Sequence, residues 1–160
     1  MKGLRLALFV ASLAFASHAF GLEPAGVAAT TGTIEYAFTP GNDAAGLIVQ
    51  TIDAARSQVL VQAFSFTHRD IADALIRAHR RGLNVEVIAD RDQTDPMDSA
   101  AMQSLAVAGM AVFADADHAA AHNKVIVIDH DTGQPALVTG SFNFTFAAQN
   151  RNAENVLVLR

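Results

Sequence analysis

The sequence contains HNKVIVID at residues 122–129 and ALVTGSFN at residues 136–143, with a polar turn between the two segments. Each segment has a run of aliphatic and β-branched residues, which predicts a pair of buried β-strands. Because side chains alternate between the two faces of a strand, His122 and Lys124 should point the same way. Asp129 has the opposite parity and should not meet them.

The polar residues of these two segments suggest an anion site. A lysine beside a histidine argues against a metal, because an ammonium group has no lone pair and repels cations. Phosphoryl transfer needs positive charge, hydrogen-bond donors and a nucleophile, and histidine can act as that nucleophile. A His-x-Lys triplet alone is more often a strand edge with a solvated lysine. The second segment changes this, because Ser141 and Asn143 add donors and Gly140 permits close backbone approach.

The combined string His-x-Lys, Asp and Gly-Ser-x-Asn resembles the signature of the phospholipase D superfamily. The likeness covers most of the chain after about residue 31 and is strongest to the small single-motif bacterial endonucleases of that superfamily. Four segments carry it further: residues 63–67, 81–85, 141–145 and 152–155.

The resemblance implies a role for each residue of the motif. His122 would be the nucleophile that forms a phosphohistidine. Lys124 and Asn143 would bind phosphate oxygens, and Ser141 would support the same site. Neither a metal nor another cofactor is implied.

Three more residues take roles from the resemblance. Glu154 matches the acid that orients the histidine, as a triad carboxylate does, with a solvated charge before the last strand as the alternative. Asp129 and Gly140 would be structural. Ten residues lie between these two, more than is usual in the family. The turn chemistry of residues 131–135 predicts a longer hairpin that leaves the site in place.

The rest of the chain alternates between predicted strands and helices, which favours an α/β fold with a mixed β-sheet sandwiched between helices. The apolar run at residues 59–66 is expected to be a central strand covered on both faces. Relatives continue past the last predicted strand into a C-terminal helix that this sequence does not include, which would leave one sheet face less covered. Further strands are expected at residues 33–38, 83–89, 111–113 and 156–159, and helices at residues 43–56, 67–81 and 95–109.

Local signals place the helix ends. Asp43 is a predicted N-cap, and Thr67-His68-Arg69-Asp70 is a predicted capping box. Asp95-Pro96 provides a cap and a first-turn proline for the third helix. Gly82 is a predicted left-handed stop for the second.

One motif supplies one histidine, whereas the leaving oxygen needs a proton from a second group. No other histidine is followed by a lysine two residues later. The histidines considered are His68, His79, His118 and His130. Because two-fold dimers are the commonest oligomers, we predict a homodimer in which two copies of His122 form one composite active site. A monomer that uses His118 as the acid is the alternative, although a loop position before the catalytic strand is the simpler prediction for His118.

The N-terminal residues predict export. Lys2 and Arg5 precede an apolar stretch, residues 6–16, that is short for a membrane span and typical of a signal peptide. We predict a signal peptide over residues 1–19, with cleavage after Ala16 or Gly21, or an uncleaved anchor, as alternatives. The protein would then reach a bacterial periplasm or the exterior.

The remaining residues are predicted to form a linker over residues 20–30 and one phospholipase D-like catalytic domain over residues 31–160. The sequence has no cysteine, which excludes a thiol nucleophile and a cysteine-ligated zinc. Disulfides, although permitted outside the cytoplasm, therefore do not contribute to its stability.

Charge does not by itself favour a nucleic-acid substrate. Without residues 1–19 the chain has 9 basic and 16 acidic residues, a net charge of −7, whereas non-specific nucleic-acid binding usually goes with a basic surface. Two local clusters remain open to interpretation. The basic one could complement a helix dipole or contact DNA, and the acidic one is more simply a solvated loop than a cation site. The basic cluster consists of Arg77, His79, Arg80 and Arg81. The acidic cluster consists of Asp90, Asp92, Asp95 and Asp98.

Three functions are therefore considered. The first is a metal-independent endonuclease that cleaves DNA or RNA without sequence preference. The second is a phospholipase D-type lipid phosphodiesterase, which an exposed apolar surface at Phe142, Phe144 and Phe146 would favour. The third is a non-catalytic binding module, which the intact motif disfavours.

Overall fold

The two segments of the motif form neighbouring antiparallel strands, β5 (Lys124–Ile128) and β6 (Ala136–Gly140). The computed structural model describes residues 32–94 and 99–160. The predicted signal peptide, the linker and the Asp95-Pro96 helix start lie outside the described residues. The other described strands are β1 (Ile34–Thr39), β2 (Gln58–Ala63), β3 (Asn84–Asp90), β4 (Ala111–Asp115) and β7 (Glu154–Leu159).

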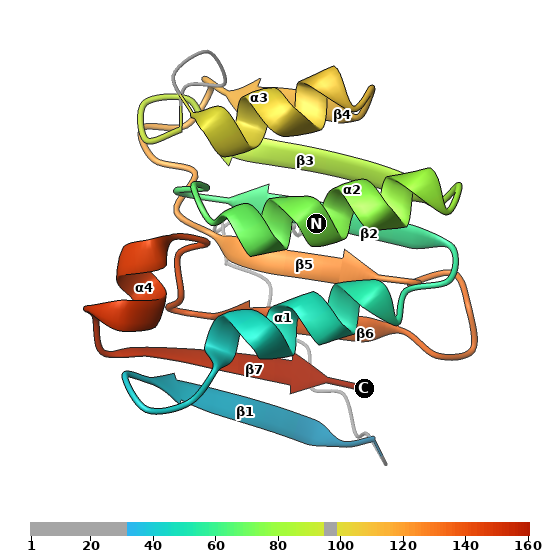
Figure 1. The fold of residues 1–160 in the computed structure, drawn as a ribbon, viewed down its shortest axis with the longest axis vertical. Coiled ribbons are helices and arrows are strands. Elements are labelled where there is room, and N and C mark those ends of the chain that lie inside the picture. The colour runs from blue at the N-terminus through green and yellow to red at the C-terminus, as the bar shows by residue number, and fades with distance from the viewer. Residues whose placement is uncertain (1–31, 95–98) are drawn as a thin grey trace, which may run out of the picture. The chain divides into compact units, whose positions relative to one another are not determined.

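These strands form one mixed sheet in the order β1-β7-β6-β5-β2-β3-β4 (Figure 1). The β2, β3 and β4 strands are parallel, and every other neighbouring pair is antiparallel. The predicted α/β fold with a mixed sheet is confirmed. Because β5 runs against β2, the start of β5 and the end of β2 lie at the same edge of the sheet.

Three helices cover one face of this sheet: α1 (Ala44–Asp53), α2 (Arg69–Arg80) and α3 (Ala100–Val107) (Figure 1). They bury aliphatic side chains against strand residues of one parity. The side chains with no exposure include Ile48, Ile52, Ile71, Leu75, Met102 and Leu105 on the helices, and Val59, Val87 and Ile126 on the strands. Burial of this kind contributes roughly 1.5–3 kcal/mol for each large aliphatic side chain.

The strand residues of the other parity line a second, apolar face. Leu60, Ile88, Val125 and Val127 line a groove there, and Phe113 is 52% exposed. In residues 32–94 and 99–160 the helices α1, α2 and α3 lie on the opposite face, so β2 is covered on one side rather than both.

The helix boundaries follow from hydrogen bonds at their ends. Asp43 caps α1 as predicted, because its carboxylate accepts from the Gly46 amide at 2.8 Å. The helix ends at Asp53 rather than Arg56, since the Asp129 carboxylate binds the Arg56 and Ser57 amides and draws the chain toward β2.

The predicted capping box at the start of α2 is wrong. His68 occupies the N-cap position and makes no side-chain capping hydrogen bond. The Thr67 and His68 amides both donate instead to the Phe144 carbonyl, at 2.9 and 2.8 Å. These bonds and the Phe66–Phe144 bridge turn the chain away from the sheet, which explains why β2 stops at Ala63. The predicted stop is confirmed, since Gly82 has φ +89°.

Other elements also differ from the sequence-based expectation. The β7 strand begins two residues earlier than expected, at Glu154. The β4 strand runs two residues further, to Asp115, and a short helix, α4 (Phe146–Asn150), was not predicted. The described part of the third helix begins after Ser99, whose hydroxyl accepts from the Met102 amide. The predicted hairpin between β5 and β6 forms, with residues 129–135 as its turn.

Candidate active site

One open hollow at the edge of the sheet contains every residue that the sequence predicts to be catalytic. It lies where β5 and β7 begin and β6 ends, and it has a volume of about 510 Å³. Its lining consists of His122, Lys124, Gly140, Ser141, Asn143 and Glu154. Residues far apart in sequence are therefore brought to one place by strand register.

Gly140 is required by the close approach of two backbones. It has φ +152°, and a Cβ at this position would collide with the backbone carbonyl of Asn155. The Ser141 and Phe142 amides donate to that same carbonyl, at 3.1 and 3.3 Å. This contact fixes the Gly-Ser-x-Asn loop against the start of β7.

Lys124 is a buried cation, with only 6% of its surface exposed. Its Nζ donates to the His122 backbone carbonyl at 2.6 Å and lies 4.7 Å from the ring centre of Phe64. Burial lowers the pKa of Lys124, and the negative charge of Glu154 partly opposes this effect. A poorly hydrated ammonium group in a hollow attracts an anion more strongly than one in water.

Glu154 is tied to the Gly-Ser-x-Asn loop. Its Oε2 accepts from the Ser141 hydroxyl at 2.5 Å, and its Oε1 accepts from the Asn152 amide group at 2.9 Å. Among the described residues no hydrogen bond joins Glu154 to His122. The role of Glu154 in orienting the histidine therefore stays a prediction.

Asn143 lies between two core phenylalanines that hold its loop. Phe142 and Phe144 are each 1% exposed, and the Phe144 ring packs edge-on against Phe66. The Asn143 Oδ1 atom is buried and has no hydrogen-bond partner in the part of the chain that the structure describes. Asn143 nevertheless lines the hollow, on a loop that its two buried phenylalanine neighbours hold in place.

Asp129 lies outside the hollow, as predicted, because it follows the opposite end of β5. It has φ +52°, and its carboxylate accepts from the amides of Arg56, Ser57 and Gln58 at 2.8–3.0 Å. Burial alone would raise the pKa of Asp129, but these hydrogen bonds hold it below its ordinary value.

The loop that leads into His122 is held by a buried carboxylate. Asp90 is 3% exposed, and its Oδ2 accepts from the Ala121 amide at 2.8 Å. The sequence placed Asp90 in an acidic cluster, where its structural role was not evident. Of the other members, Asp92 pairs with Arg91 at the surface, and Asp95 and Asp98 lie outside the described residues.

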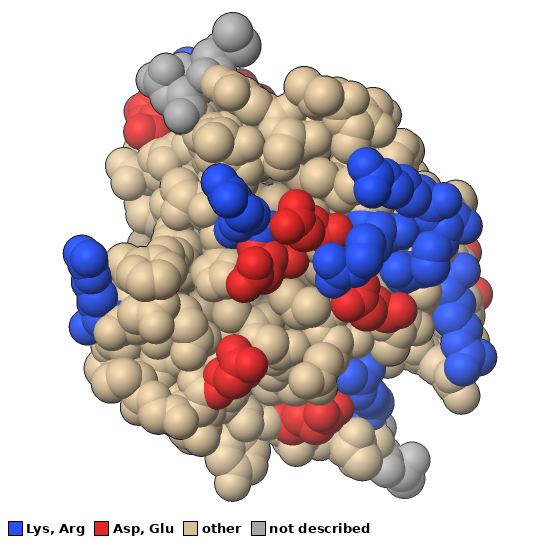
Figure 2. Space-filling model, in the orientation of Figure 1, with Lys and Arg blue, Asp and Glu red and all other residues tan. Residues whose placement is uncertain are grey.

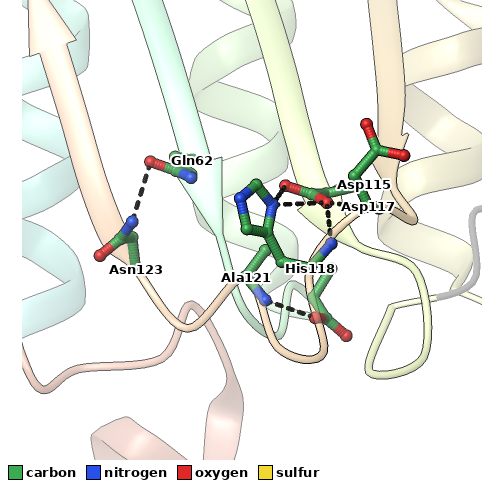
Figure 3. Close-up of polar contacts among 7 residues, drawn as sticks. Gln62, Asp115, Asp117, His118, Ala121 and Asn123 are labelled. Atoms are coloured by element: carbon green, nitrogen blue, oxygen red, sulfur yellow. Dashed lines mark hydrogen bonds and ion pairs between the residues drawn. The ribbon is translucent and has the colours of Figure 1, made fainter.

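His118 is a loop histidine, as predicted. Its side chain is 72% exposed, and its Nδ1 lies 3.0 Å from the Asp115 carboxylate (Figure 3). Burial would raise the pKa of Asp115, but hydrogen bonds from His118 and Asp117 lower it. His118 does not line the hollow.

The basic cluster lies at the far end of α2 from the hollow. Figure 2 shows basic side chains gathered over the C-terminal end of this helix. Arg77 forms two hydrogen bonds to Asp53, and Arg81 donates to the Ile52 and Ala55 carbonyls at the C-terminal end of α1. These contacts favour a structural role over a direct contact with DNA at the site. Within residues 32–94 and 99–160 no group of three His, Asp or Glu side chains is arranged to hold a metal ion.

The family described as "Cardiolipin synthase, PLD-like domain" matches residues 48–160. The chain belongs to the phospholipase D superfamily. Members of this superfamily are phosphodiesterase hydrolases, which agrees with the phosphate chemistry of the hollow.

Three similar proteins place the chain within the phospholipase D superfamily. A phospholipase D of Rickettsia bellii is 39% identical over 122 residues, which are 76% of this chain and 58% of that protein. A mitochondrial cardiolipin hydrolase of Chlamydomonas reinhardtii is 34% identical over 78% of this chain and 53% of its own length. The solved structure of the phospholipase D family member Nuc from Salmonella typhimurium is 31% identical with a TM-score of 0.71. That match covers 80% of this chain and 82% of Nuc, whereas the chain spans less than two thirds of the two curated relatives.

Some supporting residues of this phospholipase D fold were missed from the sequence. Phe64 contacts the side chains of His122 and Lys124. Asn155 forms hydrogen bonds to Ser141 through both its backbone and its side chain. Both residues lay within segments that carried the resemblance. Their contacts join separate loops, so strand periodicity could not indicate them.

Proposed function

We propose that the protein is an endonuclease that hydrolyses DNA or RNA phosphodiesters without sequence preference and without a metal ion. The observation that carries the proposal is the convergence of the imidazole, the ammonium group and the hydroxyl and amide donors in one open hollow. This set matches what a phosphodiester needs, namely a nucleophile and positive charge around the non-bridging oxygens.

The reaction proceeds in two displacements. A ring nitrogen of His122 attacks phosphorus and forms a P–N bond as the bond to the leaving oxygen breaks. Lys124 and Asn143 bind the non-bridging oxygens, and Ser141 supports them. Water then attacks phosphorus, the P–N bond breaks and His122 is released.

A second proton-transfer group completes the cycle. The leaving oxygen takes up a proton in the first step, and the attacking water loses one in the second. His118 is outside the hollow, and this favours the second copy of His122 in a homodimer as the acid and base.

Nucleic acid is favoured over lipid by two observations. The match to Nuc extends along most of both chains, and the resemblance is to the small single-motif endonucleases of the superfamily. Phe142 and Phe144, which would favour lipid if exposed, are buried, and only Phe146 is open to solvent at 60%. A lipid phosphodiesterase is the second candidate, because the curated relatives are named phospholipase D and cardiolipin hydrolase.

The proposed setting is the bacterial periplasm or the cell exterior, on the strength of the predicted signal peptide. Among the described residues, no helix has the length and apolar character needed to cross a membrane.

The test compares three substrates with the mature protein in the presence of EDTA: plasmid DNA, single-stranded RNA and phosphatidylcholine vesicles. We expect DNA or RNA cleavage that His122→Ala abolishes and that His79→Ala, at the far end of α2, leaves intact. Lipid turnover without nucleic-acid cleavage would replace the proposal by the second candidate. Activity that EDTA removes would refute the metal-free mechanism.

The dimer is tested separately by light scattering on the active wild-type protein. Full activity in a monomeric wild-type protein would refute the composite site.

A further inference from the structure

We propose that Phe64 is a positioning residue for the reaction, because its ring is the surface against which both the His122 imidazole and the Lys124 ammonium group are held. This inference rests on the proposed function. It assigns a role to a residue outside the His-x-Lys, Asp and Gly-Ser-x-Asn motif.

The geometry places one ring against two reacting groups. The ring centres of Phe64 and His122 are 4.3 Å apart, with the planes tilted by 59°. Lys124 Nζ lies 4.7 Å from the centre of the same ring. Aromatic pairs in tilted arrangements and ammonium groups over ring faces are both attractive contacts.

The Phe64 backbone is held by hydrogen bonds to buried residues, which restricts where its ring can lie. The Thr94 hydroxyl donates to the Phe64 carbonyl at 3.1 Å and accepts from the Phe66 amide at 3.0 Å. Thr94 is 2% exposed, and Phe66 has no exposed surface. The Ser99 hydroxyl donates to the Phe66 carbonyl at 2.8 Å and holds the same turn from the other side.

The Phe64 ring also stabilises the charged form of Lys124. Burial destabilises its charged form, and apart from the His122 carbonyl its nearby compensation is the charge of Glu154. The electron-rich face of an aromatic ring stabilises an ammonium group without occupying its N–H groups in hydrogen bonds. Phe64 therefore keeps Lys124 charged and oriented while its N–H groups remain available to a phosphate.

The experiment compares Phe64→Leu, which keeps an apolar side chain but removes the ring, with Phe64→Tyr, which keeps the ring. Phe113→Leu is the matched control, because Phe113 is exposed on the open sheet face. Turnover is measured on bis(4-nitrophenyl) phosphate and plasmid DNA. The charge state of Lys124 is measured without substrate, by nitrogen NMR of lysine-labelled protein.

The NMR signal of Lys124 is readily identified because Lys2 is the only other lysine in the sequence. We expect Phe64→Leu to reduce kcat about tenfold with a smaller change in KM, since loss of the ring weakens the hold on both groups. The pKa of Lys124 should fall further below its ordinary value, because leucine keeps the site dry but offers no ring face. Phe64→Tyr should restore both properties, and circular dichroism should show all variants folded.

The outcomes separate this inference from the proposed function. An unchanged kcat and an unchanged Lys124 titration in folded Phe64→Leu would overturn the role of Phe64. A reduced kcat with an unchanged titration would reduce Phe64 to a packing residue and would also overturn it. If the wild type cleaves no phosphodiester, the proposed function fails, and the substrate-free titration still decides whether the ring holds Lys124.

Discussion

Replacing the Asp129 carboxylate by an amide tests its structural role at the end of β5. In Asp129→Asn the left-handed backbone is kept, because asparagine tolerates positive φ as aspartate does. The Oδ1 atom accepts from the Ser57 and Gln58 amides and from the Ser57 hydroxyl, and Oδ2 accepts from the Arg56 amide. In the variant one of these oxygens becomes an NH₂ group that cannot accept.

The expected loss of stability follows from the hydrogen bonds that the Asp129 carboxylate accepts. One charge-assisted hydrogen bond is lost, and the others lose their charge. We therefore expect the free energy of unfolding at pH 7 to fall by about 2–3 kcal/mol. Urea denaturation measures this quantity. Asp131→Asn, an exposed neighbour, is the control and should change it by less than about 0.5 kcal/mol.

The pH dependence gives a second, independent check. The pKa of Asp129 is depressed in the folded protein, so its contribution is present above the unfolded pKa and is lost as pH falls through the folded pKa. The difference between wild type and Asp129→Asn should therefore shrink below about pH 4. A difference that persists at acid pH, or equal stability at pH 7, would refute the reasoning. A folded variant that has lost its activity would show that Asp129 acts in the reaction.

Four further predictions concern the site and its surroundings. Gly140→Ala should lower Tm by about 5 °C or more, because the new methyl group meets the Asn155 carbonyl; an unchanged melting curve would contradict the required close approach. Lys124→Met should reduce turnover by at least about 100-fold in a folded protein, because phosphate loses its buried cation. Burial lowers the pKa of Lys124, so wild-type activity should decline with rising pH before the ordinary lysine pKa is reached. A pH–activity profile that declines only at the ordinary lysine pKa would argue against this. Arg80→Gln, at the far end of α2, should leave plasmid cleavage and its salt dependence within about twofold of wild type, and a weaker salt dependence would place substrate on that end.

The arrangement of the catalytic strand was predictable because it depends on local periodicity. Strand parity placed His122 and Lys124 on one side and Asp129 apart, and the order of the motif residues indicated which strand ends had to meet. The turn chemistry of residues 131–135 correctly predicted that a longer hairpin would absorb the extra length.

Contacts between separate loops were not predictable in this way. The Phe66–Phe144 bridge replaces the expected capping box at Thr67, and it depends on residues more than seventy positions apart. The burial of Asp90 depends likewise on the Ala121 amide, which arrives from another loop. Charge clusters in a sequence do not distinguish a solvated aspartate from one that accepts buried hydrogen bonds.

The turn between β5 and β6 gives this cysteine-free chain a convenient attachment point. A side chain at Gly133 would meet no atom within 4 Å. The turn lies at the opposite end of β5 from His122, about 15 Å away along the strand. Gly133→Cys would thus introduce a single thiol for a spin label or dye. In the proposed homodimer, two such labels would define one distance. Its measurement by pulsed electron spin resonance would restrict how the two subunits can be arranged without perturbing the phosphate-binding residues.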